Sequence, residues 1–321
     1  MESRKPRREF LAGMGALATA AAVPEVLLSA RERLYPPIDL SRFDTPIPPG
    51  PFELHIGYAA ITWGGNDRQA IEDIASVGFP GIQIRSNSVQ EFGSGVALKE
   101  VLDKRHLKMI ALSSGNLSID PAIESSEIAK HVANAKFLRD AGGLYLQVID
   151  ERPKNREITA ADYKRLGKLL TELGKRTADL GVQLGYHNHM GAIGQAPDTV
   201  DQIMEAADPR YAKLELDVAH YLQGGGDPAK AVEKYSDQLL FLHLKDVERM
   251  PGAAGTKESY RFVELGRGSV NLPAVIDALR KINFRGWGMV ELDAVPDKAR
   301  TPKESAVINK RYVEEKLGLT V

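Results

Sequence analysis

Four short segments in the second half of the chain carry histidine, acidic residues or both. They are 186–190 (YHNHM), 216–220 (LDVAH), 243–246 (HLKD) and 288–291 (GMVE). A mixed set of imidazole and carboxylate donors suits a borderline divalent ion such as Mn, Co, Zn or Fe, and suits Mg less well. The chain has no cysteine, so thiolate metal sites and cysteine nucleophiles are excluded. We therefore expect one divalent metal ion bound by nitrogen and oxygen ligands.

Each of these segments ends or follows a short β-prone run, and eight such runs occur along the chain. They are 54–60, 81–85, 108–113, 144–149, 183–187, 213–217, 239–244 and 288–292. Longer stretches with apolar residues at helical spacing separate them, among them 126–141, 160–180, 199–207 and 272–282. This alternation predicts parallel strands joined by right-handed crossovers. Eight units in about 240 residues predict a closed (β/α)8 TIM barrel, in which strand ends meet at one rim.

An open, doubly wound α/β sheet is the structural alternative. Its dinucleotide-binding form carries G-x-G-x-x-G after the first strand, but residues 61–66 read ITWGGN. No change of composition marks a second domain. We therefore expect a single barrel over residues 54–321.

Each polar residue also has an ordinary structural explanation. A histidine at a strand end can cap backbone groups, and His189 is such a candidate. Asp217 could be the N-cap of a helix, with His220 in the first turn of that helix. Lys245 could be an ordinary loop residue without a role in catalysis. Glu291 is harder to explain in this way, because a carboxylate in an apolar run is costly unless it is paired or metal-bound.

With these residues in view, the chain resembles the xylose-isomerase-like barrels, which include sugar isomerases and epimerases, inosose dehydratases and apurinic endonucleases. The resemblance covers about residues 54–318. It is carried by 57–67 (GYAAITWGGND), 185–191 (GYHNHMG), 216–228 (LDVAHYLQGGGDP), 243–246 (HLKD) and 286–291 (GWGMVE). The segment 185–191, with Trp63 and Asn66 after the first strand, is most similar to the inosose dehydratase branch.

The resemblance implies one divalent metal held by residues from strands five to eight. Its implied ligands are His187, Asp217, His243 and Glu291. His220 matches a position that contacts substrate hydroxyls. Family epimerases place a Glu where this chain has His187, so a symmetrical two-base epimerisation is in doubt here. The further His and Asp ligands that an endonuclease needs are not found at the matching positions.

The implied chemistry is proton abstraction next to a carbonyl of a sugar or keto-polyol. Glu291 or His187 would take the proton, and Lys245 is a candidate for polarising an oxygen. The candidate substrate contacts are Trp63, Arg85, His189 and His220. An isomerase or epimerase is the broad expectation, and a dehydratase or lyase acting on a keto-cyclitol or keto-sugar is the specific alternative. A non-catalytic periplasmic sugar-binding barrel is the third possible function.

Residues 1–30 are typical of an exported protein. Arg7 and Arg8 precede a short, weakly apolar stretch, and the pair resembles a twin-arginine signal. We expect residues 1–30 to be a signal peptide, 31–53 a proline-rich extended lead-in, and the mature protein to be periplasmic without a membrane span. The formal net charge of −1 disfavours nucleic acid as a partner. The oligomeric state stays open.

Overall fold

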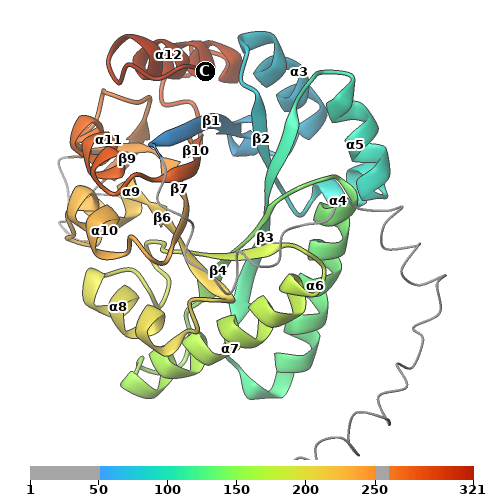
Figure 1. Ribbon diagram of the computed structural model, residues 1–321, viewed down its shortest axis with the longest axis vertical. Coiled ribbons are helices and arrows are strands. Elements are labelled where there is room, and N and C mark those ends of the chain that lie inside the picture. Colours follow the sequence, from blue (N-terminus) through green and yellow to red (C-terminus); the bar gives the residue numbers. More distant parts are fainter. Residues whose placement is uncertain (1–50, 251–259) are drawn as a thin grey trace, which may run out of the picture. The chain divides into compact units, whose positions relative to one another are not determined.

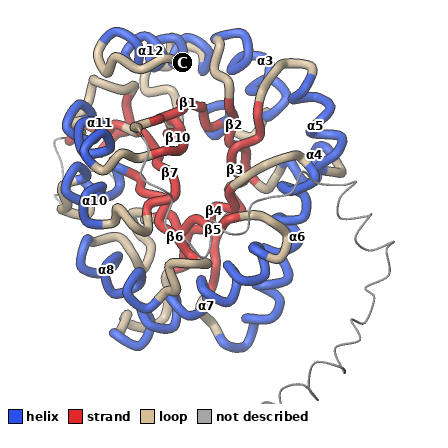
Figure 2. The backbone as a smooth tube through the Cα atoms, in the orientation of Figure 1, coloured by secondary structure: helices blue, strands red, loops and turns tan. Residues whose placement is uncertain are grey.

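The computed structural model describes residues 51–250 and 260–321, so the expected signal peptide and nearly all of the lead-in lie outside the described residues. Eight parallel strands form a closed barrel in the order β1-β10-β7-β6-β5-β4-β3-β2. Helices surround this barrel, as Figure 1 and Figure 2 show. The predicted (β/α)8 TIM barrel is therefore confirmed. In the described part of the chain, no helix combines the length and the apolar character that crossing a membrane requires.

The barrel strands closely follow the predicted runs. They are β1 (Glu53–Ala59), β2 (Gly81–Arg85), β3 (Lys108–Ser118), β4 (Tyr145–Glu151), β5 (Gln183–His187), β6 (Ala212–Asp217), β7 (Leu239–Leu244) and β10 (Arg285–Val290). The last strand begins and ends earlier than the predicted 288–292, so Glu291 follows the strand instead of lying within it.

The helices lie between these strands along the chain. The α-helices are α3 (Asp67–Val77), α4 (Ser88–Phe92), α5 (Gly95–Asp103), α6 (Glu124–Asp140), α7 (Ala160–Ala178), α8 (Pro197–Ala206), α9 (Val218–Gln223), α10 (Pro228–Lys234), α11 (Leu272–Lys281) and α12 (Pro302–Glu315). The short 3-10 helices are η2 (Ala60–Trp63) and η3 (Pro121–Ile123).

Helix α7 illustrates how local sequence builds these elements. Leu166, Leu170 and Leu173 recur at helical spacing and are fully buried. At its start, Asp162 accepts a hydrogen bond from the backbone N–H of Thr159, which satisfies a donor that the helix itself cannot pair. The apolar stripe thus faces the barrel while the first turn is capped.

One element was not predicted from the sequence. Strands β8 (Asp246–Arg249) and β9 (Tyr260–Val263) form an antiparallel hairpin between β7 and α11. The hairpin carries Phe262 toward the barrel rim, where the ring lies 4.1 Å from the Lys245 Nζ.

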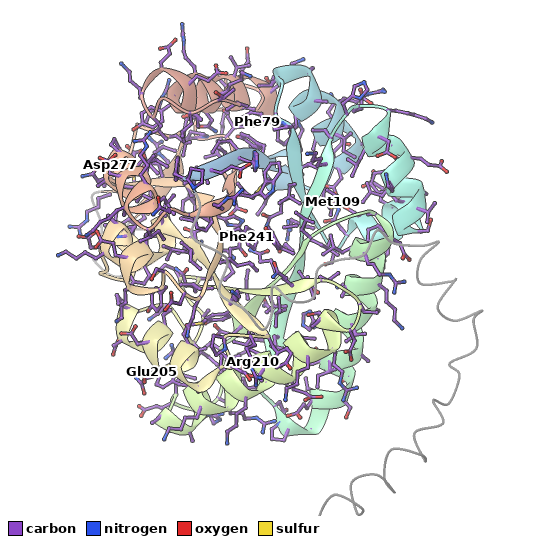
Figure 3. All side chains as sticks on the ribbon, viewed as in Figure 1. Phe79, Met109, Glu205, Arg210, Phe241 and Asp277 are labelled. Carbon is purple, nitrogen blue, oxygen red and sulfur yellow. The ribbon has the colours of Figure 1, made fainter. Side chains whose placement is uncertain are left out.

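A separate group of apolar side chains fills part of the barrel. Phe241, Trp287 and Met289 belong to this buried cluster, and Tyr145 stacks on Phe241 with ring centroids 4.9 Å apart. Figure 3 places Phe241 centrally, with Glu205 and Asp277 on outer helices.

Glycines make room for this cluster. A Cβ at Gly81 would lie 2.6 Å from a Trp287 ring carbon, and a Cβ at Gly57 would lie 2.6 Å from the Met289 methyl. The barrel interior therefore depends on small residues opposite large ones.

Candidate metal centre

Three buried side chains from consecutive strands converge at the carboxyl ends of β5, β6 and β7. His187, Asp217 and His243 each offer one donor atom, and these atoms all lie within 4.8 Å of one another. Parallel strands place their carboxyl ends at one rim, which is why residues far apart in sequence meet here. Three of the four implied ligands are thus brought together.

The spacing of the donor atoms matches that around a single ion. The His187 Nε2 lies 3.3 Å from the Asp217 Oδ2, and the His243 Nδ1 lies 3.5 Å from the same oxygen. The Glu291 Oε1 lies 3.4 Å from the His243 Nδ1. Neighbouring donors around a tetrahedral ion with bonds of about 2.1 Å are about 3.4 Å apart. The donor set therefore fits a divalent ion, with Glu291 beside the three-residue group.

Asp217 has two roles, one for each carboxylate oxygen. Its Oδ1 accepts a hydrogen bond from the backbone N–H of His220 at 2.8 Å and so caps α9. Its Oδ2 faces both histidines. The N-cap explanation and the ligand explanation are compatible, because the cap fixes the carboxylate in the orientation that presents the second oxygen.

Asn188 joins the ends of β5 and β6. Its amide donates to the Asp217 carbonyl at 3.2 Å and accepts from the Asp217 N–H at 3.0 Å. This side chain thus substitutes for a backbone pairing and aligns His187 with Asp217.

The outward nitrogens of the two histidines are held by buried polar side chains. The His187 Nδ1 is hydrogen-bonded to the Gln147 amide at 2.5 Å. The His243 Nε2 lies 3.0 Å from the Gln83 Oε1 and 2.6 Å from the Glu215 Oε1. Metal-binding histidines use their second nitrogen in this way, which fixes the ring orientation. Within the described residues, the His243 Nδ1 has no hydrogen-bond partner and is oriented toward the centre.

Lys245 lies among the carboxylates. Its Nζ donates to the Glu291 Oε1 at 2.9 Å and to the Asp293 Oδ1 at 2.5 Å, and it lies 3.7 Å from the Asp217 Oδ2. Burial lowers the Lys245 pKa, but the charges of Asp293, Glu291 and Asp217 outweigh burial and raise it above its ordinary value. Lys245 is therefore a cation at neutral pH and cannot serve as a base.

The electrostatics of the group favour positive charge at its centre. Burial opposes the ionisation of Glu291, but the charges of His243 and Lys245 outweigh it and lower the Glu291 pKa. Burial also opposes the charging of His243, whereas Glu215 and Glu291 raise the His243 pKa well above its usual range. A cation is thus stabilised between these carboxylates, whether a proton or a metal ion.

His189 and His220 lie against each other beside the three-residue group, with ring centroids 3.9 Å apart. Burial lowers both pKa values, that of His189 to about 4, so both rings are neutral at pH 7. The His220 Nδ1 is hydrogen-bonded to the Gln223 Oε1 at 2.9 Å, while its Nε2 has no hydrogen-bond partner in the described part of the chain and lies 3.9 Å from the Asp217 Oδ2.

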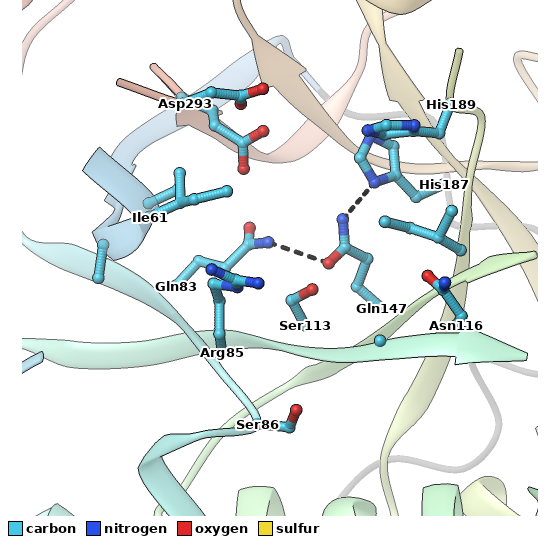
Figure 4. Close-up of a pocket in the computed structure, with 15 residues that line it drawn as sticks. Ile61, Gln83, Arg85, Ser86, Ser113, Asn116, Gln147, His187, His189 and Asp293 are labelled. Carbon is cyan, nitrogen blue, oxygen red and sulfur yellow. Dashed lines mark hydrogen bonds between the residues drawn. The ribbon is translucent and has the colours of Figure 1, made fainter. Parts of the chain in front are cut away.

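A cavity of about 210 Å³ opens beside the group, and Figure 4 shows the residues around it. Of the residues singled out from the sequence, four line it: Arg85, His187, His189 and Glu291. Four other residues singled out from the sequence do not line the cavity and lie behind its lining: Asp217, His220, His243 and Lys245.

Trp63 has a different position from the expected substrate contact. Its indole N–H donates to the Asp73 Oδ2 at 2.8 Å, and its ring packs edge-on against Tyr58. The ring is 8% exposed and does not line the cavity. The structure thus places Trp63 between the barrel and α3, away from the cavity.

A model of the xylose isomerase-like TIM barrel family matches residues 71–311 of the chain. The chain belongs to this family. The TIM barrel of this family agrees with the closed eight-stranded barrel of the structure.

Two kinds of relatives of this xylose isomerase-like chain support that assignment. The inosose dehydratase of Lacticaseibacillus casei is 28% identical over 301 residues, covering 83% of this chain and 98% of that protein. An IolI protein crystallised with a zinc atom is similar in fold, with a TM-score of 0.70, 20% identity, and coverage of 83% and 98%. An L-ribulose 3-epimerase superposes with a TM-score of 0.68 at 15% identity, covering 83% and 95%.

Several buried residues of the site were not predicted from the sequence. Glu215, Gln83 and Gln147 lie inside strands, where their types alone give no sign of which face they occupy. Asp293 was visible as an acidic residue two positions after Glu291, a spacing that places both beside one another when the chain leaves a strand.

Proposed function

We propose that this chain is a divalent-metal-dependent dehydratase that acts on a keto-polyol, a cyclitol or sugar that carries a carbonyl group. The observation that supports this most is the convergence of the His187, Asp217 and His243 donor atoms beside the charged pair Glu291–Lys245. The sequence relatives named inosose dehydratase favour loss of water over the other outcomes.

His187, Asp217 and His243 would hold the ion, with Glu291 beside it. A divalent ion in this set supplies Lewis-acid polarisation of the carbonyl and of a neighbouring hydroxyl oxygen. Three firm ligands leave positions open for substrate oxygens.

Glu291 is the proposed base. It lines the cavity, and the charge of Lys245, 2.9 Å away, lowers its pKa and keeps it ionised. Glu291 takes the proton from the carbon next to the carbonyl, and the electron pair of that bond forms the new carbon–carbon double bond as the β-hydroxyl departs. The proton on Glu291 goes to the departing hydroxide, so water leaves and the carboxylate is restored.

The same first step leads to an isomerase or epimerase if the proton returns to carbon. His187 stands where a two-base epimerase has its second carboxylate, which favours dehydration over a symmetrical two-base epimerisation. A product assay separates the outcomes: dehydration forms an unsaturated ketone or its tautomer and lowers the mass by one water.

The test is turnover of keto-cyclitols and keto-sugars with Mn²⁺, with and without chelator. We expect turnover to require the metal and to be lost in Glu291→Gln, while Glu172→Gln, a surface change on α7, keeps it. Binding of ligand that survives both treatments without any turnover would instead support a sugar-binding barrel.

We also propose that the protein is exported through the twin-arginine route, as the Arg7-Arg8 pair and the following apolar stretch indicate. Cell fractionation with a C-terminal tag tests this. Replacing Arg7 and Arg8 by lysine should retain the protein in the cytoplasm, and equal export of both forms would contradict the proposal.

A further inference from the structure

The cavity has two unlike sides. On the side of the metal centre, the polar side chains are bonded to one another, as Lys245 is to Glu291 and Asp293. On the opposite side, four polar side chains from the ends of β2 and β3 line the cavity: Arg85, Ser86, Ser113 and Asn116. Figure 4 shows Arg85, Ser113 and Asn116 along this side, across from His187 and His189.

None of these four side chains forms a hydrogen bond or ion pair with another residue of the described ranges 51–250 and 260–321. The backbone groups of this region do pair, since the Ser86 N–H donates to the Ser113 carbonyl at 3.0 Å. Asp67 interacts electrostatically with Arg85, but it accepts its hydrogen bonds from Asn87 and Ser88. Arg85 therefore presents an exposed guanidinium to the cavity with its donors available.

A backbone irregularity brings the β3 residues into place. The pairing of β3 with β4 shifts register between Ser113 and Asn116. Gly115 lies between them with a φ of +82°, a conformation that favours glycine. The bulge turns Ser113, Gly115 and Asn116 toward the cavity, where a regular strand would alternate its side chains between two faces.

We propose that this side of the cavity, defined by Arg85, Ser86, Ser113 and Asn116, binds a carboxylate of the substrate. The inference rests on the proposed function, and it narrows the substrate class to acidic keto-polyols: hydroxylated ring or chain compounds that carry a carbonyl at one end and a carboxylate at the other.

The guanidinium supports an anionic group over a hydroxyl. A guanidinium is a planar, cationic fork whose N–H donors fit two carboxylate oxygens at once, and Arg85 presents one to the cavity. The hydroxyls of Ser86 and Ser113 and the amide of Asn116 add neutral donors beside it. Charge-assisted hydrogen bonds of this kind are about twice as strong as neutral ones.

The charge balance favours a carboxylate over a phosphate. A phosphate monoester brings a charge of about −2 at neutral pH. The cavity lining already contains the carboxylates of Glu291 and Asp293. Apart from two histidines, Arg85 is the one basic side chain among the described residues that line the cavity. The single guanidinium of Arg85 can offset one negative charge. A carboxylate carries one negative charge, whereas a phosphate monoester carries about two.

Attachment at two ends would orient the substrate. The carboxylate at Arg85 and the carbonyl at the His187 side fix which carbon faces Glu291, so the proton to be removed is selected by position. An uncharged cyclitol would be held at the metal side alone.

The test compares matched probes by calorimetry on the full chain with Mn²⁺: quinate against myo-inositol, D-glucuronate against D-glucose, and D-glucose 6-phosphate as the phosphate probe. We expect each acid to bind at least about tenfold more tightly than its neutral partner. Arg85→Met should remove this preference and leave the neutral probes unchanged, and Arg85→Lys should retain part of it. Arg68→Met, a nearby change outside the cavity lining, should bind as wild type.

Equal binding of acid and neutral probes, no measurable binding of either acid, or tightest binding of the phosphate would each overturn the proposal. Such results leave the proposed dehydratase intact if turnover still depends on metal and Glu291. Acid preference without any turnover would instead remove the dehydratase and keep the carboxylate subsite.

Discussion

The Nε2 of His243 lies 2.6 Å from the Oε1 of Glu215, and both side chains are fully buried. The Glu215 carboxylate contacts the ring nitrogen that faces away from the centre, which fixes the imidazole so that its Nδ1 faces Asp217 and Glu291. A charged residue inside a barrel is expensive, and this contact gives Glu215 its partner.

Glu215→Gln should weaken metal binding by about tenfold to a hundredfold, because outer partners of a ligand histidine fix its orientation and basicity. Competition with a metal-sensitive chelator dye measures the affinity directly. The conservative amide keeps the volume, and a circular dichroism melt checks that the barrel is folded. Unchanged affinity in a folded variant would show that Glu215 does not support the metal site.

Asp217 allows its two roles to be separated by two substitutions. Both Asp217→Asn and Asp217→Ala remove the carboxylate that faces the two histidines and Lys245, so both should lower metal affinity strongly. Asn caps helices about as well as Asp, whereas Ala does not, so in the absence of metal Asp217→Asn should be about 1 kcal/mol more stable than Asp217→Ala. Urea unfolding of the metal-free proteins distinguishes them. Equal stabilities of the two variants would contradict the capping role.

Removing Lys245 should change the pH dependence of turnover. In Lys245→Met, Glu291 loses a positive neighbour that lowers its pKa, so its pKa rises and the acid limb of the rate profile moves to higher pH. Uncompensated burial of carboxylates should also cost about 3–5 kcal/mol of stability. Turnover measured from pH 4 to 9 tests this. An acid limb at the wild-type position in a folded variant would show that Lys245 does not set the ionisation of the base.

His131 should make the protein less stable in acid. It is fully buried, its Nδ1 is 2.6 Å from the Ser114 Oγ, and burial lowers its pKa to about 4. An unfolded histidine binds a proton below about pH 6.5, whereas the folded one does not until about pH 4. Stability from this residue is therefore full above pH 6.5 and falls by about 3 kcal/mol as the pH drops to 4.

Urea unfolding between pH 7 and 4.5 measures that decline. It should be smaller in His131→Gln, while His106→Asn, at an exposed histidine, should reproduce the wild-type slope. A decline of unchanged size in His131→Gln would assign the acid sensitivity to other groups.

Metal should raise the unfolding temperature if the site is formed before the ion binds. An ion at a thousand times its dissociation constant adds about 4 kcal/mol to stability. Differential scanning calorimetry with chelator and with added Mn²⁺ tests this, and His187→Ala should abolish the shift. A shift that persists in that variant would place the bound ion elsewhere.

The sequence predicted the barrel well because strand and helix alternate with clear periodicity and because strand ends carry unusual polar residues. His187, Asp217 and His243 were accessible to the same reasoning, since each lies at or next to the last residue of a β-prone run. Glu215, Gln83 and Gln147 were not, because the inward or outward direction of a residue within a buried strand depends on register. Trp63 is the opposite case, because it was expected to contact substrate and does not line the cavity. Its indole is held by a hydrogen bond to Asp73, and no local sequence pattern reveals that partner.

The β8–β9 hairpin enters the chain between β7 and α11 and leaves barrel closure intact. Phe262 nevertheless extends from it to lie over Lys245 and against His220. A substitution at Phe262 would therefore change the environment of Lys245 without altering any strand of the barrel.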